Sequence, residues 1–204
     1  MPVMILPADH LRQIIRRRHR LGIDHRDEVW DGVYVVSPEA DNEHQQIGRK
    51  LANAIESALG DEERTQVFHG ANVSDRSDDW RKNFRIPDVA VFLPENRAED
   101  RGTHWFGGPD FAVEVMSRGD RSRKKFDFYT AVHVRELLLV NRRKWRLELY
   151  RCDGKDWPLV ATVGLEESPA LPSASLGLSF RLLPGPKRPQ IEVRRADGQT
   201  RWLA

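Results

Sequence analysis

Two segments near the N-terminus repeat their apolar residues at helical spacing. Residues 8–21 place apolar side chains on one stripe and arginines on the other face, and residues 39–60 repeat an apolar side chain every four positions before a glycine. This spacing is typical of amphipathic helices, and glycine favours a helix end. The stripes consist of Leu11, Ile14, Ile15 and Leu21 in the first segment, and of Ile47, Leu51, Ile55 and Leu59, followed by Gly60, in the second.

Short runs of apolar and β-branched residues predict strands along most of the remaining chain. Residues 27–38 predict a hairpin that turns at Asp31-Gly32, and residues 120–134 predict a helix with Asp120 as its N-cap. The polar residues 94–108 predict a loop. The other expected strands cover residues 65–73, 86–93, 111–117, 136–141, 146–152, 158–163 and 178–183, and residues 189–204 predict a hairpin that turns at Asp197-Gly198.

These elements predict an α/β fold, in which a mixed β-sheet is flanked by helices. The segment between the strands 111–117 and 136–141 contains a helix and is long enough for a crossover between parallel strands. A chain of 204 residues can bury a substantial core without disulfides or metals. We therefore expect one domain.

The overall charge does not indicate a nucleic-acid binder, but two segments are locally basic. Charged residues make up 31% of the chain, with a formal net charge of +2. Residues 11–26 hold six arginines and one aspartate, and residues 118–128 hold five lysines or arginines and two aspartates. Such segments either follow a phosphate backbone or solvate exposed helix faces.

Cysteine content and hydropathy favour a soluble cytoplasmic protein. The single cysteine, Cys152, excludes an internal disulfide and a zinc site built from several cysteines. The short apolar N-terminal stretch is interrupted by Pro7, and its basic residues follow it, which is the reverse of a signal peptide. No apolar run is long enough to span a bilayer, so we expect no membrane partner.

Two carboxylates stand in apolar strands, where an unpaired charge is costly. Glu114 lies between Val113 and Val115 in "FAVEVMS", and Asp88 follows Pro87 at the head of "IPDVAVFL". Two acids on neighbouring strands favour a shared Mg²⁺, which prefers oxygen ligands and often takes one or two carboxylates together with water. Each acid alone could instead be a structural hydrogen-bond acceptor.

An ordered set of motifs resembles the PD-(D/E)xK nuclease superfamily, and more closely the bacterial restriction-endonuclease-like family called Uma-two (Uma2). The set consists of "DEVWDGVYVVSP", a helix beginning near His44, "IPDVAVFL", "FAVEVMS", "KFDFY" and "VRELLLVN". The resemblance covers residues 25–183. It leaves a basic amphipathic helix in residues 1–24 and a hairpin extension in residues 184–204. It implies a restriction-endonuclease-like core, dependence on Mg²⁺, with Mn²⁺ as a substitute, and hydrolysis of phosphodiester bonds.

The resemblance also implies roles for individual residues. Asp88 matches the family's metal-binding aspartate, Glu114 its second acid and Glu28 its upstream glutamate. The superfamily also uses the backbone carbonyl beside the second acid as a metal ligand, which here belongs to Val115. His44 matches a frequent histidine of the family, and a buried structural histidine is an equal alternative.

The lysine of the superfamily's name is displaced in this chain. Its expected position, two residues beyond Glu114 on the same face of the strand, holds Met116. The family's "KxxxY" pattern matches Lys125 and Tyr129 instead, and helical spacing turns Lys125 inward while Lys124 points away. The alternative is that the Lys125 stem lies along apolar surface with its ammonium in solvent.

The sequence therefore predicts a Mg²⁺-dependent endonuclease that acts on DNA. Ser117 could bind a phosphate or cap the following helix. Two other functions stay open: a nucleic-acid-binding module without turnover, because Met116 replaces the lysine, and a partner-binding protein in which Lys125 pairs directly with Glu114 as a buried salt bridge. A homodimer would suit cutting of both strands, although no motif indicates one.

Overall fold

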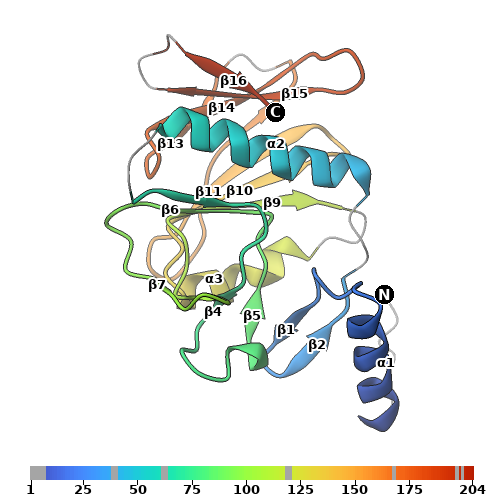
Figure 1. Ribbon diagram of the computed structural model, residues 1–204. Coiled ribbons are helices and arrows are strands. Elements are labelled where there is room, and N and C mark those ends of the chain that lie inside the picture. The colour runs from blue at the N-terminus through green and yellow to red at the C-terminus, as the bar shows by residue number, and fades with distance from the viewer. Residues whose placement is uncertain are drawn as a thin grey trace.

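The computed structural model describes residues 8–37, 41–60, 64–117, 121–166, 169–195, 198 and 200–204. These residues form one mixed α/β domain in which a central sheet, helix α2 (Asn42–Leu59) and a C-terminal sheet lie in successive layers (Figure 1). The predicted fold class is confirmed. Among the described residues, every helix is too short or too polar to traverse a bilayer.

The central sheet holds the strand that carries Glu114. Its strand order is β12-β11-β10-β9-β6-β3, and β9 and β10 run parallel while the other pairs are antiparallel. The crossover between β9 and β10 passes through α3 (Phe126–Ala131), as predicted. The strands are β3 (Gln66–Phe68), β6 (Val89–Phe92), β9 (Phe111–Met116), β10 (Glu136–Asn141), β11 (Arg146–Arg151) and β12 (Leu159–Gly164).

Alternation along β9 separates two hydrophobic cores, one on each face of the sheet. Val113 and Val115 join the core that contains α2, whereas Ala112 joins the core that contains Phe128 of α3. Because strand side chains alternate between faces, Glu114 lies on the same face as Ala112, toward α3. Figure 1 shows α2 and α3 on opposite sides of the sheet.

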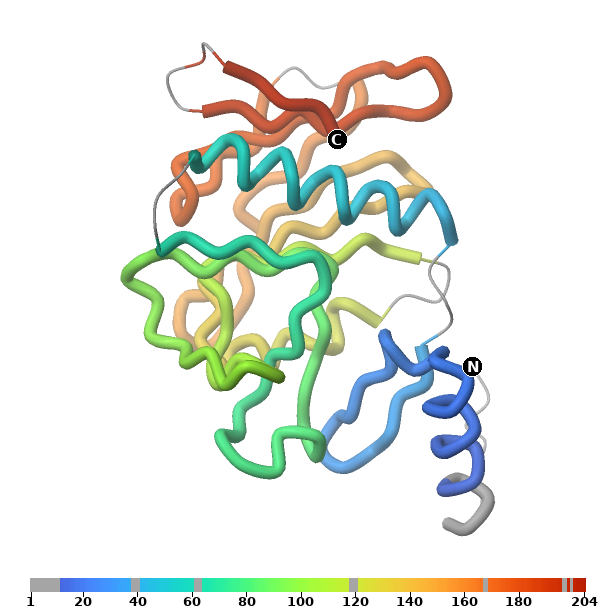
Figure 2. Tube along the Cα trace, in the orientation of Figure 1, coloured from blue at the N-terminus to red at the C-terminus, as the bar shows by residue number. Residues whose placement is uncertain are grey.

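The C-terminal sheet packs on the other side of α2. Its strands, in the order β13-β14-β15-β16, are β13 (Leu171–Ser173), β14 (Leu178–Leu183), β15 (Gln190–Arg195) and β16 (Arg201–Leu203). Strands β15 and β16 contact α2, and Figure 2 shows them beside that helix. The expected boundary between residues 183 and 184 falls between β14 and β15, which are paired along their length. The predicted turn at residue 197 lies outside the described residues.

A second, smaller sheet carries the predicted hairpin. Strands β1 (Glu28–Trp30) and β2 (Val33–Val35) pair around Asp31 and Gly32, as expected. The sheet continues in the order β2-β1-β5-β4-β8-β7. The remaining strands are β4 (Val73–Ser74), β5 (Phe84–Arg85), β7 (Glu99–Asp100) and β8 (Trp105–Phe106), and the 3₁₀ turn η1 (Trp80–Lys82) precedes β5.

Three local predictions were right only in part. The predicted loop 94–108 contains β7 and β8. The predicted single strand 65–73 is divided into β3 and β4 near Gly70, whose φ of 83° interrupts a strand. The predicted helix 120–134 is a 3₁₀ turn, η2 (Ser122–Lys125), followed by the short α3. The predicted N-cap, Asp120, lies outside the described residues.

Helix α1 (Ala8–Arg20) is tied to the β1–β2 hairpin by the buried carboxylate of Asp27. Arg18 donates to both oxygens of Asp27, at 2.6 and 2.8 Å, and the Tyr34 hydroxyl donates to it at 2.6 Å. A bidentate arginine contact fixes direction as well as distance. The basic helix is therefore anchored beside the residues that precede β1.

Candidate active site

A buried cluster of charged side chains lies between β1, β9 and the turn η2. Lys125 Nζ donates to Glu28 Oε1 at 2.9 Å and to Glu114 Oε1 at 2.8 Å. The Tyr129 hydroxyl donates to the same Glu114 oxygen at 2.5 Å. The three charged side chains are at most 10% exposed, so water screens their attraction weakly. Four of the predicted site residues therefore meet at one place.

Local structure explains how each side chain reaches this place. Glu114 faces α3 from the middle of β9. Lys125 ends the 3₁₀ turn η2 and is buried, while its neighbour Lys124 is exposed, as helical spacing predicted. Tyr129 lies one turn further along α3 and is fully buried. The alternative in which the Lys125 ammonium lies in solvent is therefore wrong.

Glu28 is held by two donors besides Lys125. The backbone N–H of Ile86 donates to Glu28 Oε1 at 2.8 Å, and the indole of Trp30 donates to Glu28 Oε2 at 2.7 Å. A carboxylate that accepts several hydrogen bonds tolerates burial. Glu28 is therefore a fixed acceptor that anchors the lysine from the smaller sheet.

Burial and neighbouring charges shift the proton affinities of this cluster. Burial lowers the pKa of Lys125, but Glu114 and Glu28 outweigh burial and raise the net pKa above its usual range, so the side chain stays an ammonium. Burial raises the pKa of Glu114 to about 7; Lys125 opposes this shift, and Asp88 and Glu28 add to it. Burial and the Glu114 charge raise the pKa of Tyr129, which stays a neutral donor.

Asp88 reaches the same place from the neighbouring strand. It directly precedes β6, which pairs antiparallel with β9 so that Val89 lies opposite Val113. The backbone N–H of Val115 donates to Asp88 Oδ2 at 2.7 Å. Asp88 is thus hydrogen-bonded to Val115, the residue after Glu114, and its charge also raises the pKa of Glu114.

A histidine and an arginine face Asp88. His44 Nε2 lies 3.3 Å from Asp88 Oδ2, and Arg26 Nη1 lies 3.6 Å from Asp88 Oδ1. Burial raises the pKa of Asp88, but His44, the Val115 amide and Arg26 outweigh it and keep the pKa below its usual value. Burial lowers the pKa of His44, and the Asp88 carboxylate reverses the shift and leaves it raised.

Ser117 stands apart from the cluster. It is exposed at the end of β9 and accepts a hydrogen bond from Arg142 at 3.3 Å. Arg142 also donates to Asp41, the N-cap of α2, at 2.8 Å, and Asp41 accepts from the backbone of His44 at 2.8 Å. Arg142 therefore links Ser117, after β9, to the start of α2, where His44 lies.

The carboxylate oxygens of the two strand acids fit a hard divalent cation. Within the described part of the chain, Asp88 Oδ1 and Glu114 Oε2 accept no hydrogen bond. Together with the predicted ligand, the Val115 carbonyl, they offer only oxygen, the donor that Mg²⁺ prefers. The described residues hold no group of three or more His, Cys, Asp or Glu side chains arranged for a metal. The donor set suits an open site completed by water.

The direct pairing of Lys125 with Glu114 is also the contact that the buried salt-bridge interpretation requires. That interpretation also accommodates Asp88, which faces His44 and Arg26. Metal binding, rather than the pairing itself, separates the two interpretations.

Arg26 and His69 belong to this site and were not predicted from the sequence. Arg26 Nη2 lies 3.3 Å from His69 Nε2. Arg26 is one of several arginines in its segment, and His69 follows a strand of only three residues. Neither residue stands out as a polar side chain within an apolar segment, which is the signal that identified Asp88 and Glu114.

Comparisons with known proteins identify a family and a similar fold. The family model Uma2, described as "Putative restriction endonuclease", matches residues 13–184. The chain is also similar to the crystal structure of a "putative nuclease belonging to DUF820" from Anabaena variabilis, with a TM-score of 0.58 and 15% identity over 74% of this chain and 82% of that chain. At that identity the likeness shows a shared fold. A search of curated proteins gives no match.

Proposed function

The chain belongs to the Uma2 family, and we propose that it is a divalent-metal-dependent endonuclease that hydrolyses phosphodiester bonds of DNA. The observation that carries the proposal is the meeting of Asp88 and Glu114, from adjacent strands, beside the Lys125 ammonium. Paired acids and a fixed cation are the groups that metal-assisted hydrolysis requires. The cytoplasmic location and a homodimer that cuts both strands stay predictions.

Asp88, Glu114 and the Val115 carbonyl would hold Mg²⁺, or Mn²⁺ in its place, and the bound ion would polarise the phosphate and lower the pKa of a water. A hydrogen bond within the chain already orients one of these ligands, Asp88. The Val115 amide fixes one oxygen of Asp88 and leaves the other without a hydrogen bond among the described residues. The depressed pKa of Asp88 keeps it ionised at neutral pH.

Lys125 would act as a fixed positive charge and hydrogen-bond donor. Its raised pKa excludes a role as a general base at neutral pH, because the amine carries its proton. In hydrolysis, the oxygen of water bonds to phosphorus, the bond from phosphorus to the leaving sugar oxygen breaks, water loses a proton to solvent, and the leaving oxygen gains one. The ammonium would stabilise the negative charge that grows on the phosphate oxygens.

One alternative function has a specific observation in its favour. Lys125 is already paired with two carboxylates, which would suit a nuclease fold that binds nucleic acid or a partner without cleaving. In that case the protein would show no metal-dependent turnover. Cleavage and metal binding must therefore be measured separately.

The test is a cleavage assay on supercoiled and linear DNA, with RNA in parallel, in Mg²⁺, Mn²⁺ or EDTA. We expect wild type to cut DNA only with metal, and Asp88→Asn to lose both cleavage and the heat of Mn²⁺ binding in calorimetry. Asp156→Asn, a change of an exposed loop carboxylate, is the matched control and should behave as wild type. Identical Mn²⁺ titrations of wild type and Asp88→Asn would refute the site, and metal binding without cleavage would favour the alternative.

A further inference from the structure

The guanidinium of Arg26 has one nitrogen without a hydrogen-bond partner among the described residues. Its Nη2 donates to His69 Nε2 at 3.3 Å, because a guanidinium has no acceptor and the imidazole must supply the lone pair. Its Nη1 is buried, lies 3.6 Å from Asp88 Oδ1, and has no hydrogen-bond partner among the described residues. Buried donors are normally paired, so this one calls for a ligand.

The contact with Asp88 differs from a structural ion pair in the same protein. Arg18 donates to both oxygens of Asp27, at 2.6 and 2.8 Å, which is a bidentate grip. Arg26 Nη1 instead lies 3.6 Å from Asp88 Oδ1, beyond hydrogen-bonding distance. Its charge is therefore next to the acid while its N–H group stays free for another oxygen.

Two glycines make room for this arrangement. A Cβ at Gly70, which has a φ of 83°, would lie 2.8 Å from Arg26 Nη1. A Cβ at Gly48 of α2 would lie 2.8 Å from His69 Nε2. Real Cβ atoms do not approach other atoms so closely, so any larger residue would displace the pair. The backbone is thus shaped to admit Arg26 and His69 beside Asp88.

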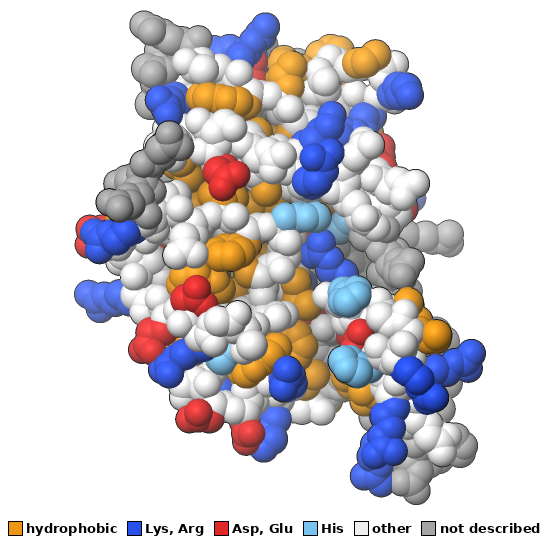
Figure 3. Space-filling view, in the orientation of Figure 1, with side chains coloured by type: hydrophobic (Ala, Val, Ile, Leu, Met, Phe, Trp, Pro, Cys, Tyr) orange, Lys and Arg blue, Asp and Glu red, His pale blue; other side chains and the backbone are white. Residues whose placement is uncertain are grey.

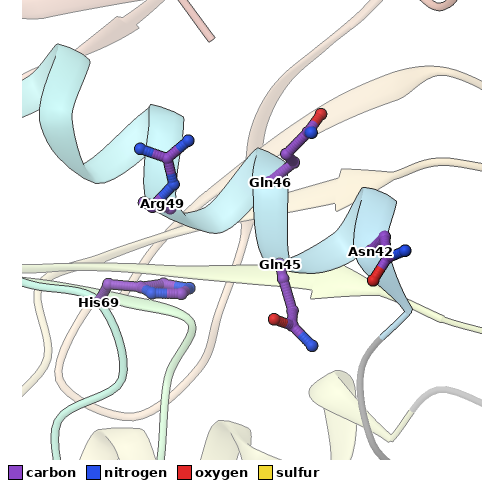
Figure 4. A pocket seen from close by; sticks show the side chains of 5 residues that line it. All are labelled: Asn42, Gln45, Gln46, Arg49 and His69. Carbon is purple, nitrogen blue, oxygen red and sulfur yellow. The ribbon is translucent and has the colours of Figure 1, made fainter.

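His69 also lines a pocket of about 500 Å³ against the first half of α2. Figure 4 shows its other lining side chains projecting from that helix: Asn42, Gln45, Gln46 and Arg49. The lining contains amides, an imidazole and a guanidinium but no carboxylate. Amide groups can bond to base edges, and cations attract phosphate. In Figure 3, Arg, Lys and His side chains gather on this face between α2 and α1.

We propose that Arg26 binds a backbone phosphate of a nucleic-acid strand beside Asp88, and that the α2 pocket takes the adjoining nucleotide. This assignment rests on the proposed nuclease function for its substrate class. The guanidinium of Arg26, whose side chain is 27% exposed, is the donor to a phosphate oxygen, and the bond to His69 sets its plane. Burial is the main cause that lowers the pKa of His69, and the charge of Arg26 adds to it. The ring therefore stays neutral and can accept the hydrogen bond from Arg26.

The experiment measures binding and cleavage separately. A fluorescent 12-nucleotide single-stranded DNA is titrated in EDTA, by anisotropy, into wild type, Arg26→Ala, Arg26→Lys and Arg101→Ala. Arg101 is a half-exposed arginine paired with Glu99 on the β7–β8 hairpin and serves as the control. We expect the Kd to rise at least tenfold in Arg26→Ala, less in Arg26→Lys, and not in Arg101→Ala. With metal, kcat should fall by about a hundredfold or more in Arg26→Ala, while Mn²⁺ affinity is retained.

Each result decides a different point. Equal DNA affinity in wild type and Arg26→Ala, or no binding by wild type, would overturn the assignment of Arg26. If wild type never cleaves DNA but binding depends on Arg26, the nuclease function fails and the phosphate site stands. If Arg26→Ala does not fold by circular dichroism, Arg26→Lys decides, because it retains one charge but loses the planar fork.

Discussion

Replacing Lys125 with methionine tests whether charge holds the buried cluster together. Methionine keeps most of the side-chain volume but removes the ammonium that Glu28 and Glu114 share. Both carboxylates are at least nine-tenths buried, and removing one partner of a buried ion pair costs about 3–5 kcal/mol. For a chain of this size that loss lowers the melting temperature on the order of 6–20 °C.

The loss should depend on pH, because an uncompensated carboxylate can take up a proton instead. For a glutamate of ordinary pKa, about 4.5, protonation costs about 5 kcal/mol at pH 8 and only about 2 kcal/mol at pH 6. Protonation therefore limits the damage at the lower pH. We expect Lys125→Met to lose about 3–5 kcal/mol at pH 8 and at most about 2 kcal/mol at pH 6.

Urea unfolding in EDTA at both pH values measures these free energies of unfolding. Lys124→Met is the control, because Lys124 is the adjacent, exposed lysine of the same turn and should change stability little. A loss below about 1 kcal/mol at pH 8 would refute the charge-held cluster. An equal loss at both pH values would show that packing, rather than charge, is responsible.

Two further predictions follow from Glu114. Burial raises the pKa of Glu114 from the ordinary 4.5 to about 7, so ionised Glu114 opposes folding as the pH rises through that interval. In EDTA, the melting temperature of Glu114→Gln should therefore match that of wild type near pH 5 and be equal or higher near pH 8. Added Mg²⁺ should stabilise wild type only. A large metal-free loss in Glu114→Gln would favour the salt-bridge interpretation. Mn²⁺ affinity of wild type, measured by calorimetry, should rise between about pH 6 and pH 8 with release of a proton, and a pH-independent affinity would contradict the raised pKa.

The larger elements were predictable because their own residues carry the pattern. Helix α2 has an unbroken apolar stripe and ends at Gly60, and β9 and β10 are apolar on both faces because both faces are covered. The two-residue strands β4, β5, β7 and β8 have no such signal. They exist because distant segments pair, which no local periodicity records.

The site was predictable only in part, for a similar reason. Asp88 and Glu114 stand out as charges in apolar strands, and the inward turn of Lys125 follows from helical spacing. Glu28 came from the family resemblance, since its flanking sequence shows only a hairpin. Arg26 reaches Asp88 through the space left at Gly70, a contact between loops that no spacing along the chain encodes.

The position of Lys125 in a turn gives Glu28 a structural role. A lysine at position 116 would come from β9 itself, the strand that carries Glu114, and the sheet would hold its backbone in place. Lys125 comes instead from a single 3₁₀ turn, whose hydrogen-bond geometry is poorer than that of a strand ladder or an α-helix. Its ammonium is fixed from two sides, by Glu114 on the central sheet and by Glu28 on the smaller sheet. Because Glu28 is itself held by the Ile86 amide and the Trp30 indole, the smaller sheet supplies the rigidity that the turn lacks.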